Sequence, residues 1–149
     1  MKGNYYDIAI NDLHFAKVGI EADLGEEVAG YNSCASGCTQ AGEKFLKYLF
    51  ILFNIPFEAR LKETHNLNVL LRELIKEFPE LKDLTTHCRY LNDFYIEARY
   101  PGDNFEWVDY ETAKLCYDYA TNIKAAVDAI IENPANEERL RDVLQNKYK

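Results

Sequence analysis

The segment LKDLTTHCRYLNDFYIEARYPGD, residues 81–103, indicates the helical class of this chain. Its apolar residues recur at intervals of three and four, at Leu81, Leu84, Cys88, Leu91 and Tyr95. This spacing is typical of an α-helix with one face against a core. We expect the helix to end near Tyr100, because Pro101 disfavours α geometry at the preceding residue and Gly102 permits a turn.

Two arginines, Arg89 and Arg99, repeat on a neighbouring stripe of this predicted helix, with Asn92 between them. A cation in the last turn, such as Arg99, is favoured by the negative end of the helix dipole. A guanidinium is also well suited to bidentate contact with phosphate. The sequence therefore leaves a structural role and a ligand-binding role open for Arg99.

The rest of the chain predicts further amphipathic helices over residues 4–24, 31–53, 64–78 and 109–133, and a short terminal helix from 136. Thr64 and Asp109 are the expected N-caps. In the 31–53 helix, we expect Glu43, Lys44 and Lys47 to lie opposite the apolar face. The fold class is thus an all-α, antiparallel up-and-down bundle of four to five helices with a short C-terminal helix. We divide it into a bundle over residues 1–133 and a helical tail over 134–149.

Composition limits the functions that the chain can have. It has 149 residues, of which 48% are hydrophobic, and a net charge of −8. These values fit one globular domain, and the negative charge argues against broad, sequence-independent DNA binding. We see no signal peptide and no apolar run long enough to span a bilayer, so we expect a cytoplasmic protein that does not bind membranes.

The cysteines are expected to be reduced thiols in the core. Cys34 and Cys38, one helical turn apart, could instead hold a metal together with His87 and Cys88. Both cysteine groups lie on apolar stripes, which favours the role of small buried hydrophobic residues. We therefore predict no metal site and no cofactor.

Three short motifs resemble the HEPN domain family of small helical proteins: CTQAGEKFLK (residues 38–47), THNL (64–67) and EARYPGD (97–103). The family pattern in the first motif corresponds to Gln40, Ala41, Glu43, Lys44 and Lys47. The second motif has His65-Asn66-Leu67 where the family usually has His-Asp-Leu, and the third carries the family's Arg-Tyr-Pro turn. The resemblance extends over about residues 4–132, nearly the whole chain.

The resemblance implies a homodimer that binds a nucleotide or RNA. Many family members also act with a minimal nucleotidyltransferase subunit, in toxin–antitoxin-like pairs. Gly37 and Gly42 lack side chains, so we expect them to let a neighbouring helix approach closely, which favours a dimer. The resulting hypothesis is a binding module, not catalytic alone, whose ligand-binding residues are Lys44, Lys47, His65, Arg89, Arg99 and Tyr100.

The alternative hypothesis is a metal-independent ribonuclease. Other branches of the family carry an arginine four to six residues before a histidine, and only Arg60 and His65 have this spacing here. Such an enzyme needs a base for the 2′-hydroxyl and a cation for the developing phosphorane charge, which His65 with Arg60 or Arg99 would supply. We expect Arg60 in a loop and His65 in the first turn of a helix, where a capping or interhelical hydrogen bond is the simpler role.

Overall fold

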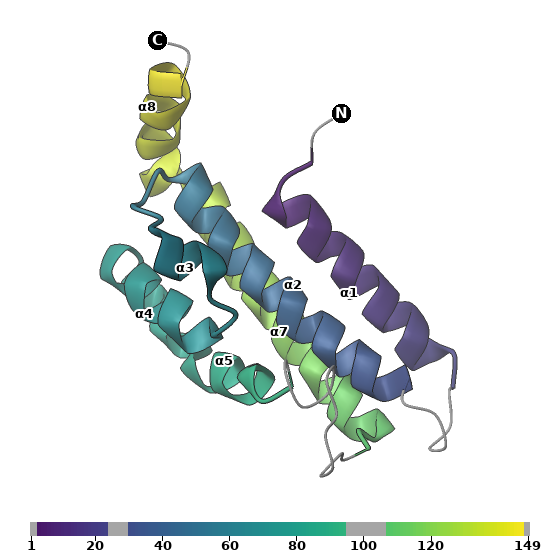
Figure 1. Cartoon of the computed structure of the whole chain (residues 1–149). Coiled ribbons are helices and arrows are strands. Elements are labelled where there is room, and N and C mark those ends of the chain that lie inside the picture. Colours follow the sequence, from purple (N-terminus) through teal and green to yellow (C-terminus); the bar gives the residue numbers. More distant parts are fainter. Residues whose placement is uncertain (1–2, 24–29, 95–106, 148–149) are drawn as a thin grey trace.

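The computed structural model describes residues 3–23, 30–94 and 107–147, and within these ranges every regular element is a helix (Figure 1). The elements are α1 (Tyr5–Glu21), α2 (Gly30–Leu52), α3 (Ala59–Glu63), α4 (Leu67–Glu77), η1 (Pro79–Leu84), α5 (Thr85–Asn92), α7 (Tyr110–Glu132), η2 (Pro134–Asn136) and α8 (Glu137–Lys147). The prediction of an all-α bundle is confirmed. None of the described helices combines the length and the apolar character that crossing a membrane requires.

The long helices α1, α2 and α7 form the body of the bundle, and the shorter α4 and α5 form a helical hairpin beside α2 and α7 (Figure 1). α1 runs antiparallel to α2. α2 and α7 run in the same direction (Figure 1). Accordingly, the rings of Tyr31 and Tyr110, near the starts of the two helices, lie 5.9 Å apart. The second and fourth legs of an up-and-down bundle are expected to share a direction in this way.

Side-chain caps set several helix starts. Asn4 and Asp7 form a capping box at α1, and the Asp109 side chain accepts a hydrogen bond from the backbone of Thr112 at α7, as predicted. The prediction of Thr64 as the cap of the next helix is wrong. Asn66 caps α4, accepting from the backbone N–H groups of Asn68 and Val69.

A short helix precedes this cap, in a segment predicted to be only a connection. Thr64 is the last flanking residue of α3, and its hydroxyl accepts a hydrogen bond from the backbone N–H of Asn66 at 3.1 Å. α3 spans five residues, too few to show a helical period, and Leu61 is its one buried side chain.

The continuous helix predicted over residues 81–100 is divided in the structure. Pro79 begins the 3₁₀ helix η1, and α5 starts only at Thr85, whose hydroxyl donates to the carbonyl of Lys82 at 2.6 Å. The predicted apolar stripe is nevertheless correct, since Leu81, Leu84, Cys88 and Leu91 are all buried. The predicted end of this helix, with Tyr95 and residues 99–102, lies outside the described residues.

Gly37 and Gly42 of α2 allow close packing inside the chain. A Cβ on Gly42 would lie 3.1 Å from Ile123 Cδ1 of α7, and 3.7 Å from a methyl group of each of Leu67 and Leu91. A Cβ on Gly37 would lie 3.7 Å from the carbonyl oxygen of Asp12 in α1. The close helix approach expected at these positions therefore serves the bundle itself, and gives no support to a dimer.

Candidate functional site at the junction of α2 with the α3–α4 segment

Two charged residues at the end of the CTQAGEKFLK motif, in its EKFLK part (residues 43–47), are buried: Glu43 and Lys47. Their relative exposures are 6% and 3%, and Glu43 Oε2 lies 3.4 Å from Lys47 Nζ along one side of α2. The expectation that both would lie opposite the apolar face is wrong. The physical reason is that α3 and the α3–α4 segment cover this side of α2 and supply polar partners for both charges.

These partners complete a network between α2 and the segment before α4. Lys47 Nζ donates a hydrogen bond to the carbonyl oxygen of Lys62 at 2.7 Å, and Glu43 Oε1 lies 2.7 Å from Nδ1 of His65. Buried charges are tolerated when hydrogen bonds replace the lost hydration. The His-Asn-Leu motif and the EKFLK motif therefore meet in space, although 22 residues separate His65 from Glu43.

His65 is the part of this network that solvent can reach, with 52% of its side chain exposed. It immediately precedes the N-cap of α4, not the first turn of the helix as predicted. Glu43 contacts the Nδ1 edge of the imidazole ring and so fixes its orientation. A histidine oriented by a carboxylate can accept a proton or contact a phosphate oxygen, so both hypotheses remain chemically possible at this position.

Two polar residues that the motifs did not single out position this region. Asn92 Oδ1 of α5 accepts a hydrogen bond from the backbone N–H of Leu67 at 3.0 Å, and the buried Thr39 hydroxyl of α2 donates to the carbonyl of Leu91 at 2.6 Å. The predicted helix puts Asn92 on an outer stripe, between Arg89 and Arg99. An amide at that spacing carries no sequence signal that it will cap another helix.

The other predicted site residues do not join His65. Lys44 of α2 forms a salt bridge with Asp12 of α1, and both side chains are about one-fifth exposed. Arg60, in α3 and not in a loop, has Nε 3.3 Å from Glu58 and Nη2 3.4 Å from Glu73. These contacts direct the Arg60 guanidinium toward carboxylates, which weakens its pairing with His65 in a ribonuclease.

The remaining predicted residues lie on or after α5. Arg89 is on the exposed side of α5, while Arg99 and Tyr100 lie outside the described residues.

The thiols that could have formed a metal site are in the core. Cys34, Cys38, Cys88 and Cys116 are unpaired by disulfides and buried, and burial raises the pKa of each. Within the described ranges, no group of three or more His, Cys, Asp or Glu side chains is arranged to hold a metal ion.

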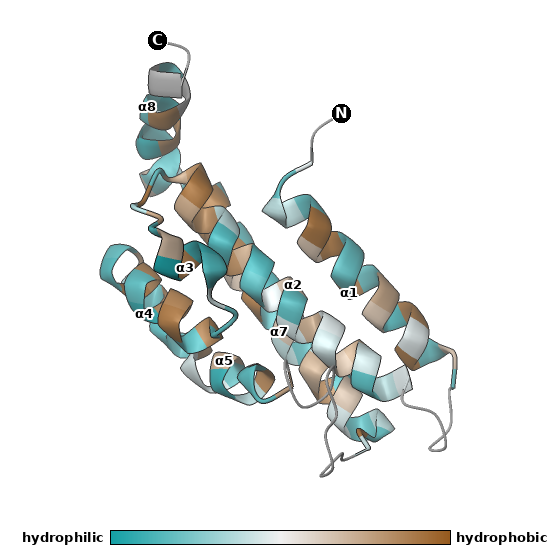
Figure 2. Cartoon of the chain, in the orientation of Figure 1, coloured by the Kyte–Doolittle hydropathy of each residue, from teal (hydrophilic) through white to brown (hydrophobic). Residues whose placement is uncertain are grey.

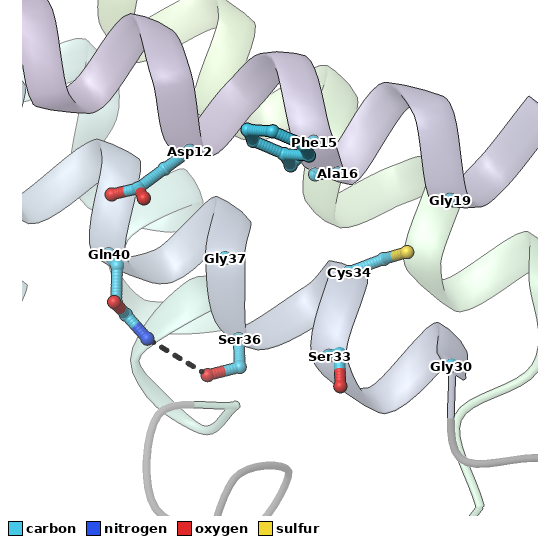
Figure 3. A pocket seen from close by; sticks show the side chains of 10 residues that line it. All are labelled: Asp12, Phe15, Ala16, Gly19, Gly30, Ser33, Cys34, Ser36, Gly37 and Gln40. Atoms are coloured by element: carbon cyan, nitrogen blue, oxygen red, sulfur yellow. Dashed lines mark hydrogen bonds between the residues drawn. The ribbon is translucent and has the colours of Figure 1, made fainter.

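A separate groove of 430 Å³ lies between α1 and α2 (Figure 3). Its walls are mostly small residues, and in Figure 3 Phe15 stands on the α1 side facing the glycine and serine positions of α2. Gln40 at one end donates to the Ser36 hydroxyl at 3.3 Å, and Asp12 is the one charged side chain among the described residues that line the groove. The described lining thus has a carboxylate and no cation, which suits phosphate poorly.

Comparison with known proteins agrees with the motifs. A family model described as HEPN domain matches residues 4–130. Searches of curated proteins and of solved structures gave no significant match. The match includes α1, α2, α4, α5 and nearly all of α7, and with them the Glu43–Lys47–His65 network. The chain therefore belongs to the HEPN domain family, as a helical module of the nucleotide- and RNA-related type.

Proposed function

We propose that this protein is a binding module for a phosphate-bearing ligand, a nucleotide or an RNA segment, and that it has no catalytic activity of its own. The observation that carries the proposal is the burial of two charged side chains of the first motif. Glu43 and Lys47 are buried against each other and against the Lys62 carbonyl, so they hold the helices together and are not presented to a substrate. Recognition is then left to cations on the surface.

A minimal nucleotidyltransferase subunit is the proposed protein partner, in a toxin–antitoxin-like pair in the cytoplasm. Family membership supports this part of the proposal. A ligand-binding HEPN subunit could deliver a nucleotide or an RNA end to such a partner, which would carry out the transfer.

The second candidate function is a metal-independent ribonuclease, and one observation favours it. The 2.7 Å contact between Glu43 Oε1 and His65 Nδ1 gives a carboxylate-oriented imidazole with an exposed edge. General-base catalysis commonly uses such a pair. The enzyme would also need a cation close to the reacting phosphate, and the described guanidinium with the expected sequence spacing, Arg60, is held by Glu58 and Glu73.

Titration of the protein with short fluorescently labelled RNAs and with nucleotides tests the proposal. We expect saturable binding that weakens as salt increases, because phosphate contacts release counterions. Absence of binding to RNA and to nucleotides at low salt would contradict the proposed function. Cleavage of the RNA by the same preparation would favour the ribonuclease.

We also propose that the module is a homodimer that uses the exposed apolar side chains of α1. Ile8, Phe15 and Val18 recur at helical spacing on this helix and are 46%, 63% and 47% exposed. Figure 2 shows hydrophobic stretches along α1. Covering such a stripe with the same stripe of a second copy would remove apolar surface from water.

Replacing Phe15 with glutamate should convert this dimer to a monomer, because the substitution places a charge in the centre of the apolar stripe. Light scattering at tens of micromolar protein should change from the dimer mass to 17.3 kDa. The control is Ile51→Glu, at an exposed apolar position on α2 that is 48% exposed, and it should leave the mass unchanged. A wild-type mass of 17.3 kDa would contradict the dimer.

A further inference from the structure

The basic side chains of the described residues can be divided into those that form a salt bridge and those that do not. Most basic side chains that could face a phosphate already face a carboxylate. Among the arginines, Arg60, Arg139 and Arg141 form salt bridges, to Glu58 and Glu73, to Glu77 and to Glu137 respectively. Arg72 and Arg89 have no carboxylate partner within the described part of the chain. Among the described residues of this protein of net charge −8, these two guanidiniums are therefore not neutralised by a salt bridge.

Both guanidiniums belong to one groove. Arg72 of α4 and Arg89 of α5 both line a hollow of 340 Å³ in the α4–α5 hairpin, together with Asn68, Leu71, Ile75 and Thr85. The two helices lie side by side at the edge of the bundle (Figure 1), so one guanidinium stands on each wall. The groove has a volume within the range of small-molecule sites.

The chemistry of the lining selects the class of ligand. Leu71 and Ile75 provide an apolar floor, and the Asn68 amide can donate a hydrogen bond beside Arg72. The Thr85 hydroxyl proton is already donated to the Lys82 carbonyl, which leaves the guanidiniums as the principal donors. Guanidiniums above an apolar floor suit a ligand with an anionic part that can accept paired hydrogen bonds and a flat, weakly polar part.

The nearest competitor for Arg72 in sequence is Glu73, and it is occupied. Glu73 Oε2 lies 3.0 Å from Lys76 Nζ and Glu73 Oε1 lies 3.4 Å from Arg60 Nη2. These hydrogen bonds lower the pKa of the Glu73 carboxyl, that of Lys76 most strongly, so the group stays ionised and paired with those two cations. Arg72 is thereby left for an external anion.

We propose that the α4–α5 groove is the phosphate-binding site of this protein, with Arg72 and Arg89 contacting the phosphate of an RNA strand or nucleotide and Leu71 and Ile75 contacting its sugar or base. This inference rests on the proposed function and assigns its location. Of the ligand-binding residues predicted from the sequence, Arg89 lies in this groove, and the structure adds Arg72, Asn68, Leu71 and Ile75. It also places the ligand outside the Glu43–His65 network and away from the α1–α2 groove.

The test compares two double variants with the same loss of charge. Arg72→Gln with Arg89→Gln removes the proposed contacts, and Lys114→Gln with Arg141→Gln removes two exposed cations that are paired with Asp118 and Glu137. Binding of a short single-stranded RNA is measured by fluorescence anisotropy across a salt series. Inorganic phosphate and a mononucleotide serve as competitors, and a polyglutamate peptide as a second labelled probe.

Loss of two phosphate contacts should reduce the slope of log Kobs against log salt by about 1.4, at about 0.7 per contact on a single strand. We expect at least about a tenfold loss of affinity for the groove variant, while the control keeps both slope and affinity close to wild type. Thermal melting should be unchanged for the groove variant, since Arg72 and Arg89 make no ion pair among the described residues. Competition by the mononucleotide would indicate a nucleotide site, and competition by longer RNA alone an RNA site; either supports the phosphate assignment.

The outcomes that overturn the inference are distinct from failure of the proposed function. If wild-type protein binds RNA and the groove variant binds with the same slope and affinity, the groove assignment is wrong and the proposed function stands. If wild-type protein binds neither RNA nor mononucleotide, both are wrong. If polyglutamate binds as tightly as RNA, and only through Arg72 and Arg89, the groove is a docking site for an acidic protein segment and the phosphate assignment is overturned.

Discussion

Replacing Glu43 with leucine should lower the free energy of unfolding by about 3–5 kcal/mol, the usual effect of removing one partner from a buried ion pair. Leucine is close to glutamate in volume, so the effect comes from the lost charge and not from a cavity. Lys47, 3% exposed, would keep the Lys62 carbonyl as a partner and lose the carboxylate that pairs with it among the described residues. His65 would lose its Nδ1 partner. Urea unfolding followed by circular dichroism measures the change.

Two further variants separate the effect of the buried charge from a general sensitivity of α2 to substitution. Removing both charges, with Glu43→Leu and Lys47→Met, should recover most of the lost stability, because a buried ion pair and an apolar pair of similar volume are often of similar stability. Lys44→Met breaks the more exposed salt bridge to Asp12 and should cost about 1 kcal/mol or less. A cost for Glu43→Leu that is no larger than for Lys44→Met would show that the network does not hold α2 to the α3–α4 segment.

Folding should slow the reaction of Cys88 and Cys116 with a thiol reagent at pH 8 by about 1,000-fold or more. Burial raises the pKa of both thiols from 9.0 to about 12, and this lowers the thiolate population of each in the folded protein. Cys38 should react equally slowly, since burial raises its pKa and the nearby thiols Cys116 and Cys34 raise it further. Cys34, which is 5% exposed, should react first.

The measurement is a time course with Ellman's reagent in buffer and in denaturant, where all four thiols should react rapidly. Several thiols that react in buffer at the denatured rate would contradict the core role of the cysteines. Reactivity that appears only after addition of a chelator would indicate a bound metal instead.

The same shifts predict that stability falls at alkaline pH. The unfolded chain loses thiol protons above about pH 9, while folded Cys88 and Cys116 keep theirs to about pH 12. The folded state then binds more protons than the unfolded state, so this contribution is complete below pH 9 and is lost as pH rises through that window.

Most of the fold could be predicted from the sequence because its long helices have clear apolar periods. The stripe of Leu81, Leu84, Cys88 and Leu91 is buried, and Asp109 caps α7 as expected. The division between η1 and α5 could not be predicted, since a 3₁₀ segment and an α-helix place residues three apart on nearly the same side. α3 was missed because five residues do not show a helical period.

The site could be predicted only as a set of motifs, and their geometry differed from expectation. A charged residue in a helix is normally assigned to the solvent face, and Lys47 and Glu43 are exceptions because α3 and the α3–α4 segment supply their partners. Arg72 carried no motif and was missed. Arg72 matters because Arg89 lines the same groove from the neighbouring helix. The spacing of residues within one helix does not show which residues of another helix lie beside it.

The measurement that tests the central claim most directly follows the binding and the integrity of one labelled RNA in the same sample, without added metal, for the wild-type protein and for His65→Ala. A non-catalytic binding module predicts a saturable, salt-sensitive rise in anisotropy with the wild-type protein, while gel electrophoresis of the recovered RNA shows full-length strands after prolonged incubation. RNA fragments that form with the wild-type protein and not with His65→Ala would contradict the account, and would identify the Glu43–His65 pair as the catalytic centre of a ribonuclease.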